Sequence, residues 1–282
     1  MNTRDLGGHS GCRILLCEDE QGAAFVRKIS STHAYNARLQ VQARKQAEYN
    51  GNAIRTPRVI REGLLEDGLF YFDMEYVRGI TLAEYMKHIE IDKIRGLVEQ
   101  IMEYILAEAA RQTTAAPQIF QDKLSSLQTK FVHEDNRVIH EAMSLLVQHD
   151  WSAVPQSACH GDMTLENIIV KGDRLYFIDF LDSFYNSWVL DLSTLLQDAQ
   201  SLWSYRFMQP MDINTVIRLM IFRDILMDAV HEHWHGQADR EVYFALLLKL
   251  MRIFPYTKDK LTYDFLTNKT ISVMRCLERS AQ

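Results

Sequence analysis

Most of the side chains that could do polar chemistry lie in one short stretch of the chain. Residues 160–167 read HGDMTLEN, and residues 178–180 read IDF after two β-rich runs joined by a Lys-Gly-Asp turn. The carboxylate of Asp162 could accept or orient the proton of a hydroxyl group. Asn167 and Asp179 offer amide and carboxylate oxygens, which suit Mg²⁺, and a hairpin between them would bring the two together. The other interpretation is a hairpin with incidental surface acids.

The pattern H-G-D-x-x-x-x-N, followed by a strand that ends in I-D-F, resembles the catalytic loop of aminoglycoside phosphotransferases and choline kinases. These families are small-molecule kinases with a protein-kinase-like fold. The resemblance implies that Asp162 is the catalytic base and that Asn167 and Asp179 bind Mg²⁺. It also implies structural roles for His160, beside the metal site, and for Asp191, which would open the next helix and support the loop.

From the same resemblance we expect ATP or GTP as co-substrate, Mg²⁺ as cofactor and a hydroxyl of a small molecule as acceptor. The acceptor classes are aminoglycosides, amino alcohols such as choline, and sugar-like metabolites. The sequence decides neither the nucleotide nor the acceptor. Two alternatives remain: a non-catalytic nucleotide-binding sensor or scaffold, and a protein kinase or nucleotidyl transferase. No A-P-E-like segment follows Asp179, which argues against a protein kinase.

The N-terminal region carries residues that the resemblance assigns to the nucleotide. A glycine-rich turn precedes the first hairpin strand, and glycines let backbone N–H groups approach phosphates closely. We therefore expect four residues of this turn to cover the nucleotide: Gly7, Gly8, Ser10 and Gly11. Lys28, in a β-rich run, resembles the family lysine that contacts the α- and β-phosphates. A solvated cation on a strand is the alternative for Lys28.

The family lysine usually pairs with a glutamate on the following helix, and this chain departs from that pattern. The helix expected over residues 35–50 offers Gln42 and Gln46 on one face, and Glu48 only near its end. A glutamine can accept a hydrogen bond from Lys28 but cannot neutralise its charge. The sequence leaves open which of the three side chains partners the lysine.

Residues 72–79 resemble the linker between the two lobes of the family fold. The resemblance implies that the Glu75 carbonyl and the Val77 N–H contact the adenine edge, and that Met74 lines the base pocket. Backbone contacts of this kind place few demands on side chains. The plain alternative is an edge strand followed by a loop.

The two parts of the chain differ in secondary-structure pattern. Short apolar runs bounded by turns predict an antiparallel sheet with one helix over residues 1–78. Later, apolar residues recur at spacings of three and four, which predicts helices. These helices cover residues 94–111, 134–149, 190–203, 214–233, 240–253 and 263–279. With the resemblance, the predicted fold class is α+β: a bilobal protein-kinase-like fold with a nucleotide-binding N-lobe (1–78) and a C-lobe (79–282) that carries the catalytic loop and acceptor-binding helices.

Composition excludes several other classes of protein. The 282 residues are 47% hydrophobic, with a net charge of −6 and no basic footprint, so we expect no nucleic-acid partner. No apolar run reaches the ~18 residues that cross a bilayer, so we expect no membrane span and a cytoplasmic location. The four cysteines form no C-x-x-C pair. The expected partners are a nucleotide and a small-molecule acceptor; the oligomeric state is open.

Three further features have competing interpretations. Residues 231–235 read HEHWH, which suggests a metal or cation site, but a solvated helix end explains them better. Asp182 could touch a metal or the acceptor, or could be a solvated loop acid. Lys123, Lys130 and Arg137 could approach an anionic substrate, although charged helix faces are usually solvated.

Overall fold

The computed structural model describes the chain except for residues 1–2, 8–11, 209 and 280–282. The chain divides into two compact units. The first, which we call the small unit, comprises Met1–Leu82 and Asn167–Asp182, and the second, the helical unit, comprises Ala83–Glu166 and Ser183–Gln282. The lobe boundary predicted after residue 78 stays a proposal, and each unit is described by itself.

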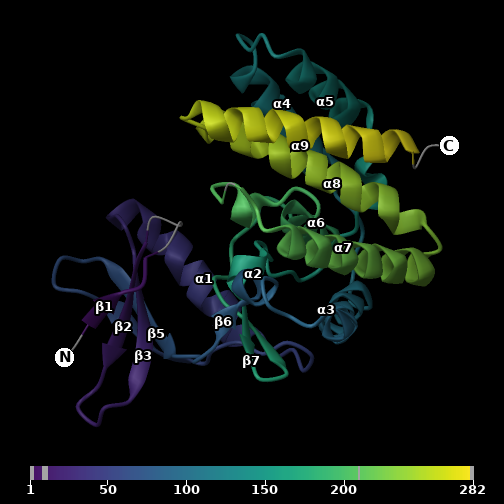
Figure 1. Cartoon of the computed structure of the whole chain (residues 1–282). Coiled ribbons are helices and arrows are strands. Elements are labelled where there is room, and N and C mark those ends of the chain that lie inside the picture. The colour runs from purple at the N-terminus through teal and green to yellow at the C-terminus, as the bar shows by residue number, and fades with distance from the viewer. Residues whose placement is uncertain (1–2, 8–11, 209, 280–282) are drawn as a thin grey trace. The chain divides into compact units, whose positions relative to one another are not determined.

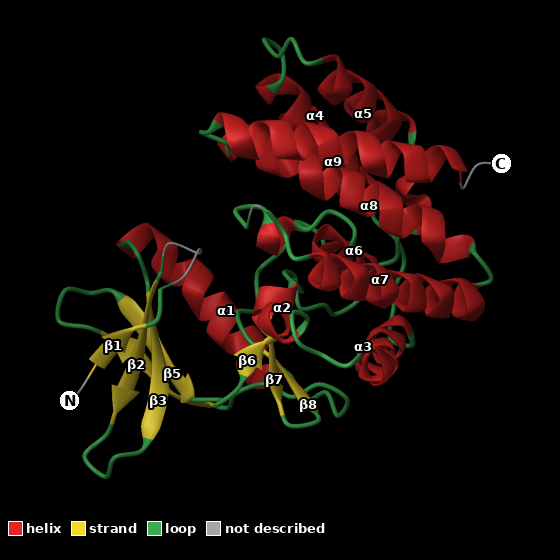
Figure 2. Ribbon diagram, in the orientation of Figure 1, coloured by secondary structure: helices red, strands yellow, loops and turns green. Residues whose placement is uncertain are grey.

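The main sheet of the small unit is antiparallel, with strand order β1-β2-β3-β5-β4 (Figures 1 and 2). Its strands are β1 (Thr3–Asp5), β2 (Arg13–Glu18), β3 (Ala24–Ile29), β4 (Val59–Leu64) and β5 (Phe70–Glu75). The predicted hairpin is confirmed, because β2 and β3 pair from Arg13 opposite Ile29 to Glu18 opposite Ala24. Strand β1 was not predicted: its three residues are polar and exposed, and only pairing with β2 makes them a strand.

Helix α1 (Asn36–Glu48) covers the small unit's core and confirms the helix predicted there. Its buried residues are Leu39, Gln42, Ala43 and Gln46, which recur at spacings of three and four as one helix face requires. The two apolar members join a core cluster with Cys12, Val26, Phe70, Phe72 and Met74. The two buried glutamines need hydrogen-bond partners, which the site described below provides.

A second sheet in the small unit has the order β6-β7-β8. Its strands are β6 (Ile80–Thr81), β7 (Ile168–Lys171) and β8 (Arg174–Phe177), and the β7–β8 hairpin was predicted. Gly172 adopts a φ of 58° in the hairpin turn, a left-handed conformation that glycine tolerates best. Arg55 binds to the outer strand, since its N–H donates to Leu175 O and its carbonyl accepts from Phe177 N.

The helical unit contains α3 to α9 and the short 3₁₀ turns between them (Figure 2). The short α2 (Leu82–Tyr85) begins where the small unit ends. The bounds are α3 (Ile94–Ala109), α4 (Pro117–Lys130), α5 (Arg137–Gln148), α6 (Trp188–Ala199), α7 (Ile213–Trp234), α8 (Gln237–Ile253) and α9 (Lys260–Arg279). All but α4 match predicted helices within a few residues. The sequence pattern did not predict α4, whose buried face consists of Phe120, Leu124 and Leu127 among polar neighbours.

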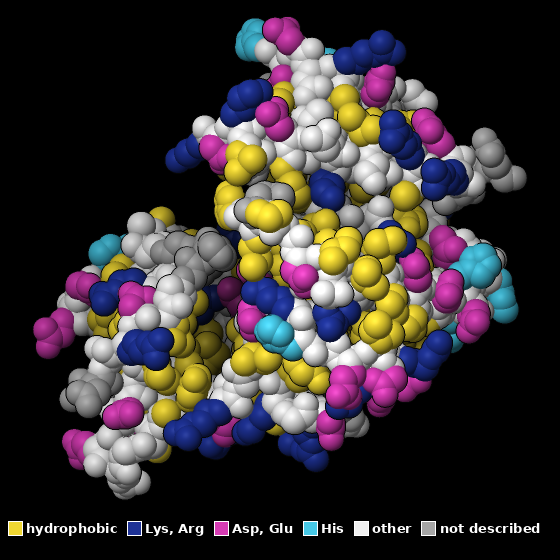
Figure 3. Space-filling view, in the orientation of Figure 1, with side chains coloured by type: hydrophobic (Ala, Val, Ile, Leu, Met, Phe, Trp, Pro, Cys, Tyr) yellow, Lys and Arg dark blue, Asp and Glu magenta, His cyan; other side chains and the backbone are white. Residues whose placement is uncertain are grey.

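Helix α6 is almost entirely buried, and α8 contacts both α6 and α9. Helix α7 shows the opposite pattern on one side: Ile213, Ile217 and Met220 are exposed, and Figure 3 shows hydrophobic side chains over this helix. Among the described residues, no helix is long and apolar enough to cross a membrane. The four cysteines form no disulfide bond within the described part of the chain.

Candidate active site

The loop that contains Asp162 is anchored at its start by a buried carboxylate from α6. Asp191 accepts hydrogen bonds from the backbone N–H groups of His160 (2.7 Å) and Gly161 (2.9 Å). The hydroxyl of Tyr104, on α3, donates to the same carboxylate at 2.8 Å. Burial and the nearby Asp191 charge raise the pKa of Tyr104 well above its ordinary value, so this phenol stays a donor. These contacts are the kind that a supporting residue would make, and the supporting role that the resemblance implies for Asp191 stays a prediction.

A second buried carboxylate from α6 holds the other end of the same loop. Asp198 accepts from the N–H of Leu165 and from the N–H of Ser204, both at 2.8 Å. Burial raises the pKa of Asp198 to about 6, against the hydrogen bonds that lower it. Asp198 was not predicted from the sequence, although a signal was present: Asp191 and Asp198 are seven residues apart on α6, whose residues are almost all buried, and so share a face.

Asp162 lies within this anchored loop, and its side chain is 31% exposed. Its N–H donates to Nδ1 of the fully buried His160 at 3.2 Å, and its carbonyl accepts from Thr164 N at 2.8 Å. Gly161 has a φ of 91°, which a side chain would strain. The loop therefore holds its own backbone and leaves the Asp162 carboxylate partly open to solvent.

Lys249, on α8, contacts the Asp162 carboxylate and was not predicted. Its Nζ lies 3.3 Å from Asp162 Oδ1 and also hydrogen-bonds to the hydroxyl of Thr194 on α6. Burial lowers the pKa of Lys249, and the Asp162 charge opposes that shift. No local motif predicts Lys249, because it is 87 residues from Asp162 along the chain and only helix packing brings the two together.

In the small unit, Lys28 on β3 points to the α1 side of the sheet and is only 2% exposed. Its ammonium hydrogen-bonds to Gln42 Oε1 at 3.1 Å and forms an ion pair with Asp179. Its neighbour Arg27 belongs to the opposite side of the strand, where it pairs with Asp73 at 2.7 Å. The strand alternation therefore separates the two cations, with Lys28 beside the predicted metal ligand.

The open question about the lysine's helix partner is answered by Gln42. Gln46 instead donates to the carbonyl of Pro57 at 2.8 Å and contacts the sulfur of Met74. Glu48 is exposed at the end of α1. The helix thus gives Lys28 a neutral acceptor, and the balancing negative charge comes from Asp179.

Asn167 and Asp179 lie at the two arms of the β7–β8 hairpin, close to its open end. The N–H of Ile178 donates to Asn167 O at 3.0 Å, so the hairpin pairing extends to these residues. Asp179 has a φ of 61°, a rare conformation outside glycine that costs about 1–3 kcal/mol and tends to occur at functional sites. The sequence predicted that the hairpin would bring the two residues together, and the backbone pairing agrees. Their metal role stays a prediction.

The other residues predicted for the nucleotide site belong to the N-terminal glycine-rich turn and to residues 74–77. Gly8, Ser10 and Gly11 lie outside the described residues; Gly7 has a φ of 67° and donates its N–H to Asp5. Met74 is buried at the end of β5 beside the helix α1. The exposed carboxylate of Glu75 pairs with Arg58, and residues 76–79 form an irregular segment between β5 and β6. The adenine contacts predicted for Met74, Glu75 and Val77 stay a prediction.

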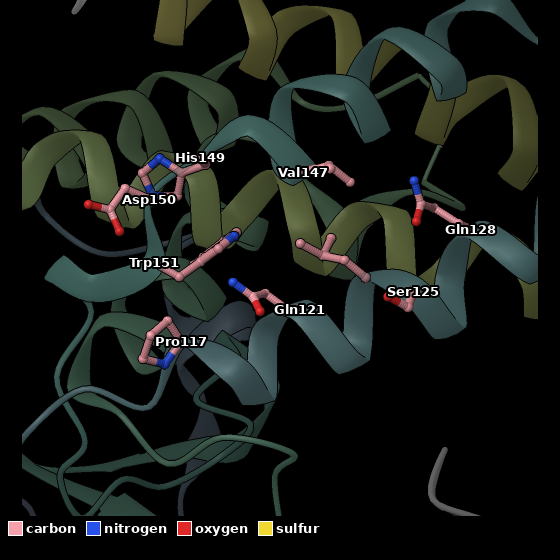
Figure 4. A pocket seen from close by; sticks show the side chains of 9 residues that line it. Pro117, Gln121, Ser125, Gln128, Val147, His149, Asp150 and Trp151 are labelled. Atoms are coloured by element: carbon pink, nitrogen blue, oxygen red, sulfur yellow. The ribbon is translucent and has the colours of Figure 1, made fainter.

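A separate pocket of about 350 Å³ lies in the helical unit between α4, α5 and the turn after α5 (Figure 4). Its lining residues are Pro117, Gln121, Leu124, Ser125, Gln128, Val147, His149, Asp150 and Trp151. None of them is a predicted site residue.

The histidine-rich end of α7, residues 231–235, does not form a metal site. His231 pairs with Asp239 at 2.7 Å, and no group of three or more His, Cys, Asp or Glu side chains suited to a metal occurs among the described residues.

Comparisons with known proteins agree with this arrangement. The model of the phosphotransferase enzyme family (APH) matches residues 4–217. Among curated protein sequences, none matches this chain. Among solved structures, a thermostable mutant of aminoglycoside phosphotransferase APH(4)-Ia, in ternary complex with AMP-PNP and hygromycin B, is similar. It is 14% identical with a TM-score of 0.66, and the match covers 97% of this chain and 93% of that one.

Two further solved structures resemble the chain over nearly its whole length. A putative fructosamine-3-kinase from Thermobifida fusca is 14% identical with a TM-score of 0.59, covering 98% of this chain and 94% of that one. A choline/ethanolamine kinase family protein from Mesorhizobium loti is 16% identical with a TM-score of 0.59, covering 99% and 91%. These similarities, with the observed small sheet and helical remainder, confirm the predicted fold class.

Proposed function

Because the chain belongs to the phosphotransferase enzyme family, we propose that it transfers the γ-phosphoryl group of ATP or GTP to a hydroxyl of a small molecule. Similar structures carry AMP-PNP together with a small-molecule acceptor, which supports a nucleotide and an acceptor as the two substrates. The fold alone does not choose the acceptor.

The observation that carries the proposal is the anchoring of the Asp162 loop. Two buried carboxylates, Asp191 and Asp198, fix the loop at both ends, and the Asp162 side chain is left partly exposed. A structural acid on a surface turn needs no such support. A catalytic acid does, because a misplaced reacting group lowers the rate steeply.

In the proposed reaction, the oxygen of the acceptor hydroxyl attacks the γ-phosphorus, and the Asp162 carboxylate accepts the proton of that hydroxyl. A new O–P bond forms, the bond from phosphorus to the β–γ bridging oxygen breaks, and the nucleoside diphosphate leaves with that oxygen. Lys28 would neutralise charge on the nucleotide phosphates from the small unit, because phosphoryl transfer depends mainly on positioning and charge stabilisation. Only four residues separate Asp162 from Asn167, so the base and the phosphate-binding hairpin are tied closely along the chain.

The donor set of the hairpin fits a magnesium ion. Asn167 and Asp179 provide one amide and one carboxylate oxygen, and Mg²⁺ in nucleotide sites is commonly held by one or two such groups together with phosphates and water. The ion would supply neutralising charge on the β- and γ-phosphates. The left-handed backbone at Asp179 aims its carboxylate from the hairpin end, where Lys28 reaches it.

One observation favours a second function, that of a non-catalytic nucleotide sensor. Lys28 has a neutral helix partner, Gln42, where the family usually has a glutamate. Loss of that charge could accompany loss of catalysis. The retained residues Asp162, Asn167 and Asp179 favour the enzyme.

The test is phosphoryl transfer itself. The full chain would be incubated with Mg²⁺ and γ-³²P-labelled ATP or GTP and with pooled hydroxyl compounds: amino alcohols, aminoglycosides, sugars, sugar acids and sugar phosphates. Labelled product that depends on both enzyme and pool supports the enzyme. Nucleotide binding with neither transfer nor slow hydrolysis, in every pool, would favour the sensor.

A further inference from the structure

Four cations from two helices gather in the helical unit, and we call them the basic cluster. Lys123 and Lys130 come from α4 and are seven residues apart, so they share one face of that helix. Lys249 and Arg252 come from α8, three residues apart and again on one face. The proposed reaction uses none of these side chains except through the contact of Lys249 with Asp162.

Aromatic rings tie the two helices' cations together. Lys123 Nζ lies 5.6 Å from the centre of the Phe184 ring, and the Arg252 guanidinium lies 4.6 Å from the centre of the same ring. Lys130 Nζ lies 4.9 Å from the centre of the Tyr256 ring and 3.3 Å from its hydroxyl. The three distances to ring centres fall within the roughly 6 Å range of cation–π attraction. The rings therefore hold the cations near one another where repulsion would separate them.

The charges of the basic cluster act on one another. The pKa of Lys123 is lowered by its burial first, and then by the charges of Arg252 and Lys130. The pKa of Tyr256 is lowered by its hydrogen bond to Lys130 and by the same three cations. Within the part of the chain that the structure describes, neither Lys123 nor Lys130 forms an ion pair with a carboxylate. The fold thus maintains a local excess of positive charge in a protein whose net charge is −6.

The basic cluster continues to the proposed catalytic base. Burial lowers the pKa of Lys249 and the Arg252 charge adds to that shift, while Lys249 Nζ lies 3.3 Å from Asp162 Oδ1. Lys249 keeps 18% of its side chain exposed, and Tyr256, at the other end, keeps 70% exposed. A path of positive charge therefore leads from solvent to the carboxylate that would deprotonate the acceptor.

We propose that the basic cluster binds a negatively charged group of the acceptor, so that the substrate is a hydroxyl compound bearing a carboxylate or a phosphate. This inference rests on the proposed function and names its substrate class. The exposed ring of Tyr256 offers apolar surface to the rest of such a molecule. Aminoglycosides and choline are cationic, and this cluster would repel them.

The pocket between α4 and α5 is not the site that we assign. Pro117, Gln121 and Gln128 line that pocket from one face of α4, while the 3.6-residue period places Lys123 and Lys130 on another face. No Lys or Arg is among the residues that line that pocket. Its side chains suit a neutral, partly apolar molecule.

The test compares matched hydroxyl compounds of different charge. The full chain, saturated with Mg²⁺ and AMP-PNP so that the nucleotide subsite is blocked, would be titrated calorimetrically. Two sets serve as probes: D-glucuronate, D-glucose and D-glucosamine, then glycerol 3-phosphate and glycerol. We expect the anion in each set to bind at least tenfold more tightly than its neutral counterpart, and glucosamine to bind most weakly. The two sets distinguish a carboxylate from a phosphate as the preferred group.

The variant Lys123→Gln/Lys130→Gln removes two cations that are not in contact with Asp162. We expect it to weaken the preferred anion at least fivefold and to leave AMP-PNP affinity unchanged. Lys93→Gln, which removes an exposed cation paired with Glu90 on the same unit, is the matched control and should change neither. Both sites are at or near the surface, so folding is expected to survive.

The outcomes separate the two proposals. If AMP-PNP does not bind in the presence of Mg²⁺, the proposed function fails, and this inference fails with it. If AMP-PNP binds but the neutral or cationic probe binds as tightly as the anion, the basic cluster is only a solvated surface. The same conclusion follows if no probe binds, or if the double variant behaves like the control.

Discussion

The small unit and the helical unit differ in how far the charges of their cations are balanced by neighbouring carboxylates. In the small unit, Lys28 is enclosed by a neutral acceptor, Gln42, and by one carboxylate, Asp179, so its charge is balanced locally. In the helical unit, Lys249 contacts the partly exposed carboxylate of Asp162, and the other three cations of the basic cluster add positive charge. Under the proposed function, the phosphate-binding residues would be prepared by internal pairing, whereas the acceptor-binding residues would keep positive charge for a ligand to neutralise.

The two units also differ in how their key residues are held. Lys28 sits on β3, where ladder pairing fixes it, and Asp179 follows directly on the β7–β8 hairpin, two residues after β8 ends. Asp162 sits on a loop, which two buried carboxylates of α6 must fix instead. Loss of a residue should therefore affect nucleotide binding in the small unit and turnover or loop stability in the helical unit.

The largest expected effect is on turnover. Asp162→Asn removes the proton acceptor and retains the shape of the side chain, so kcat should fall by about 10²–10⁴-fold, as for other general bases. Nucleotide affinity should stay within about twofold, because the residues proposed to bind the nucleotide and its metal ion belong to the small unit. Steady-state kinetics and calorimetry measure the two quantities. Near-normal turnover would remove Asp162 from the role of base.

The next effect is on stability and depends on pH. The pKa of Asp198 is raised from 3.8 to about 6 in the fold, so its contribution to stability is present below about pH 4 and is lost as the pH rises through 6. One pKa unit corresponds to about 1.4 kcal/mol, so the loss is roughly 3 kcal/mol. Asp198→Asn cannot titrate and should lack this loss.

Urea unfolding of both proteins at pH 4.5 and pH 7.5 checks this expectation. The wild-type protein should exceed the variant in unfolding free energy by more at the lower pH. The variant should be less stable at every pH, because its amide cannot accept from both the Leu165 and Ser204 N–H groups. A difference that does not change with pH would mean that Asp198 is ionised throughout.

In the small unit, the neutral partner of Lys28 gives a smaller effect. Gln42→Leu leaves a buried ammonium with one acceptor fewer, which costs about 1–3 kcal/mol, and nucleotide affinity should fall about tenfold. Gln42→Glu retains the acceptor and should restore affinity. Glu48→Gln, at the exposed end of the same helix, is the control and should have no effect. Equal nucleotide dissociation constants for Gln42→Leu and the control would show that Gln42 does not position Lys28.

The smallest effect is expected at the linker. Glu75 pairs with Arg58 through side chains that are both largely exposed, and such pairs contribute about 0–1 kcal/mol. Because the proposed adenine contact uses the backbone, Glu75→Ala should change nucleotide affinity by less than about twofold in a calorimetric titration. A tenfold loss would mean that the side chain itself contacts the nucleotide.

The parts of the small unit that have local sequence signals could be predicted from the sequence. The β2–β3 and β7–β8 hairpins were predictable because apolar runs and a Lys-Gly-Asp turn are local signals. The pairing of Asp191 with the loop was also expected, through the resemblance. Strand β1 was missed because its polar residues become a strand only by pairing with β2.

The acceptor side was harder to predict for a physical reason. Lys249 approaches Asp162 only because α8 packs on α6, and Lys123 approaches Arg252 only through the shared Phe184 ring. Contacts between residues so far apart along the chain, 87 positions for Lys249 and Asp162, leave no periodic trace in one sequence. The choice of Gln42 over Gln46 likewise depends on helix rotation, because both are buried on the same face.

The measurement that tests the central claim most directly is the metal dependence of nucleotide binding. Thermal unfolding would be followed with ATP and with GTP, each with and without Mg²⁺, for the wild-type chain and for Asp179→Asn, which tolerates the left-handed backbone. A nucleotide at 100-fold its dissociation constant adds about 2.7 kcal/mol. We predict a Mg²⁺-dependent increase in Tm for the wild type that is largely lost in the variant. An equal shift without metal, or no shift with either nucleotide, would contradict the account.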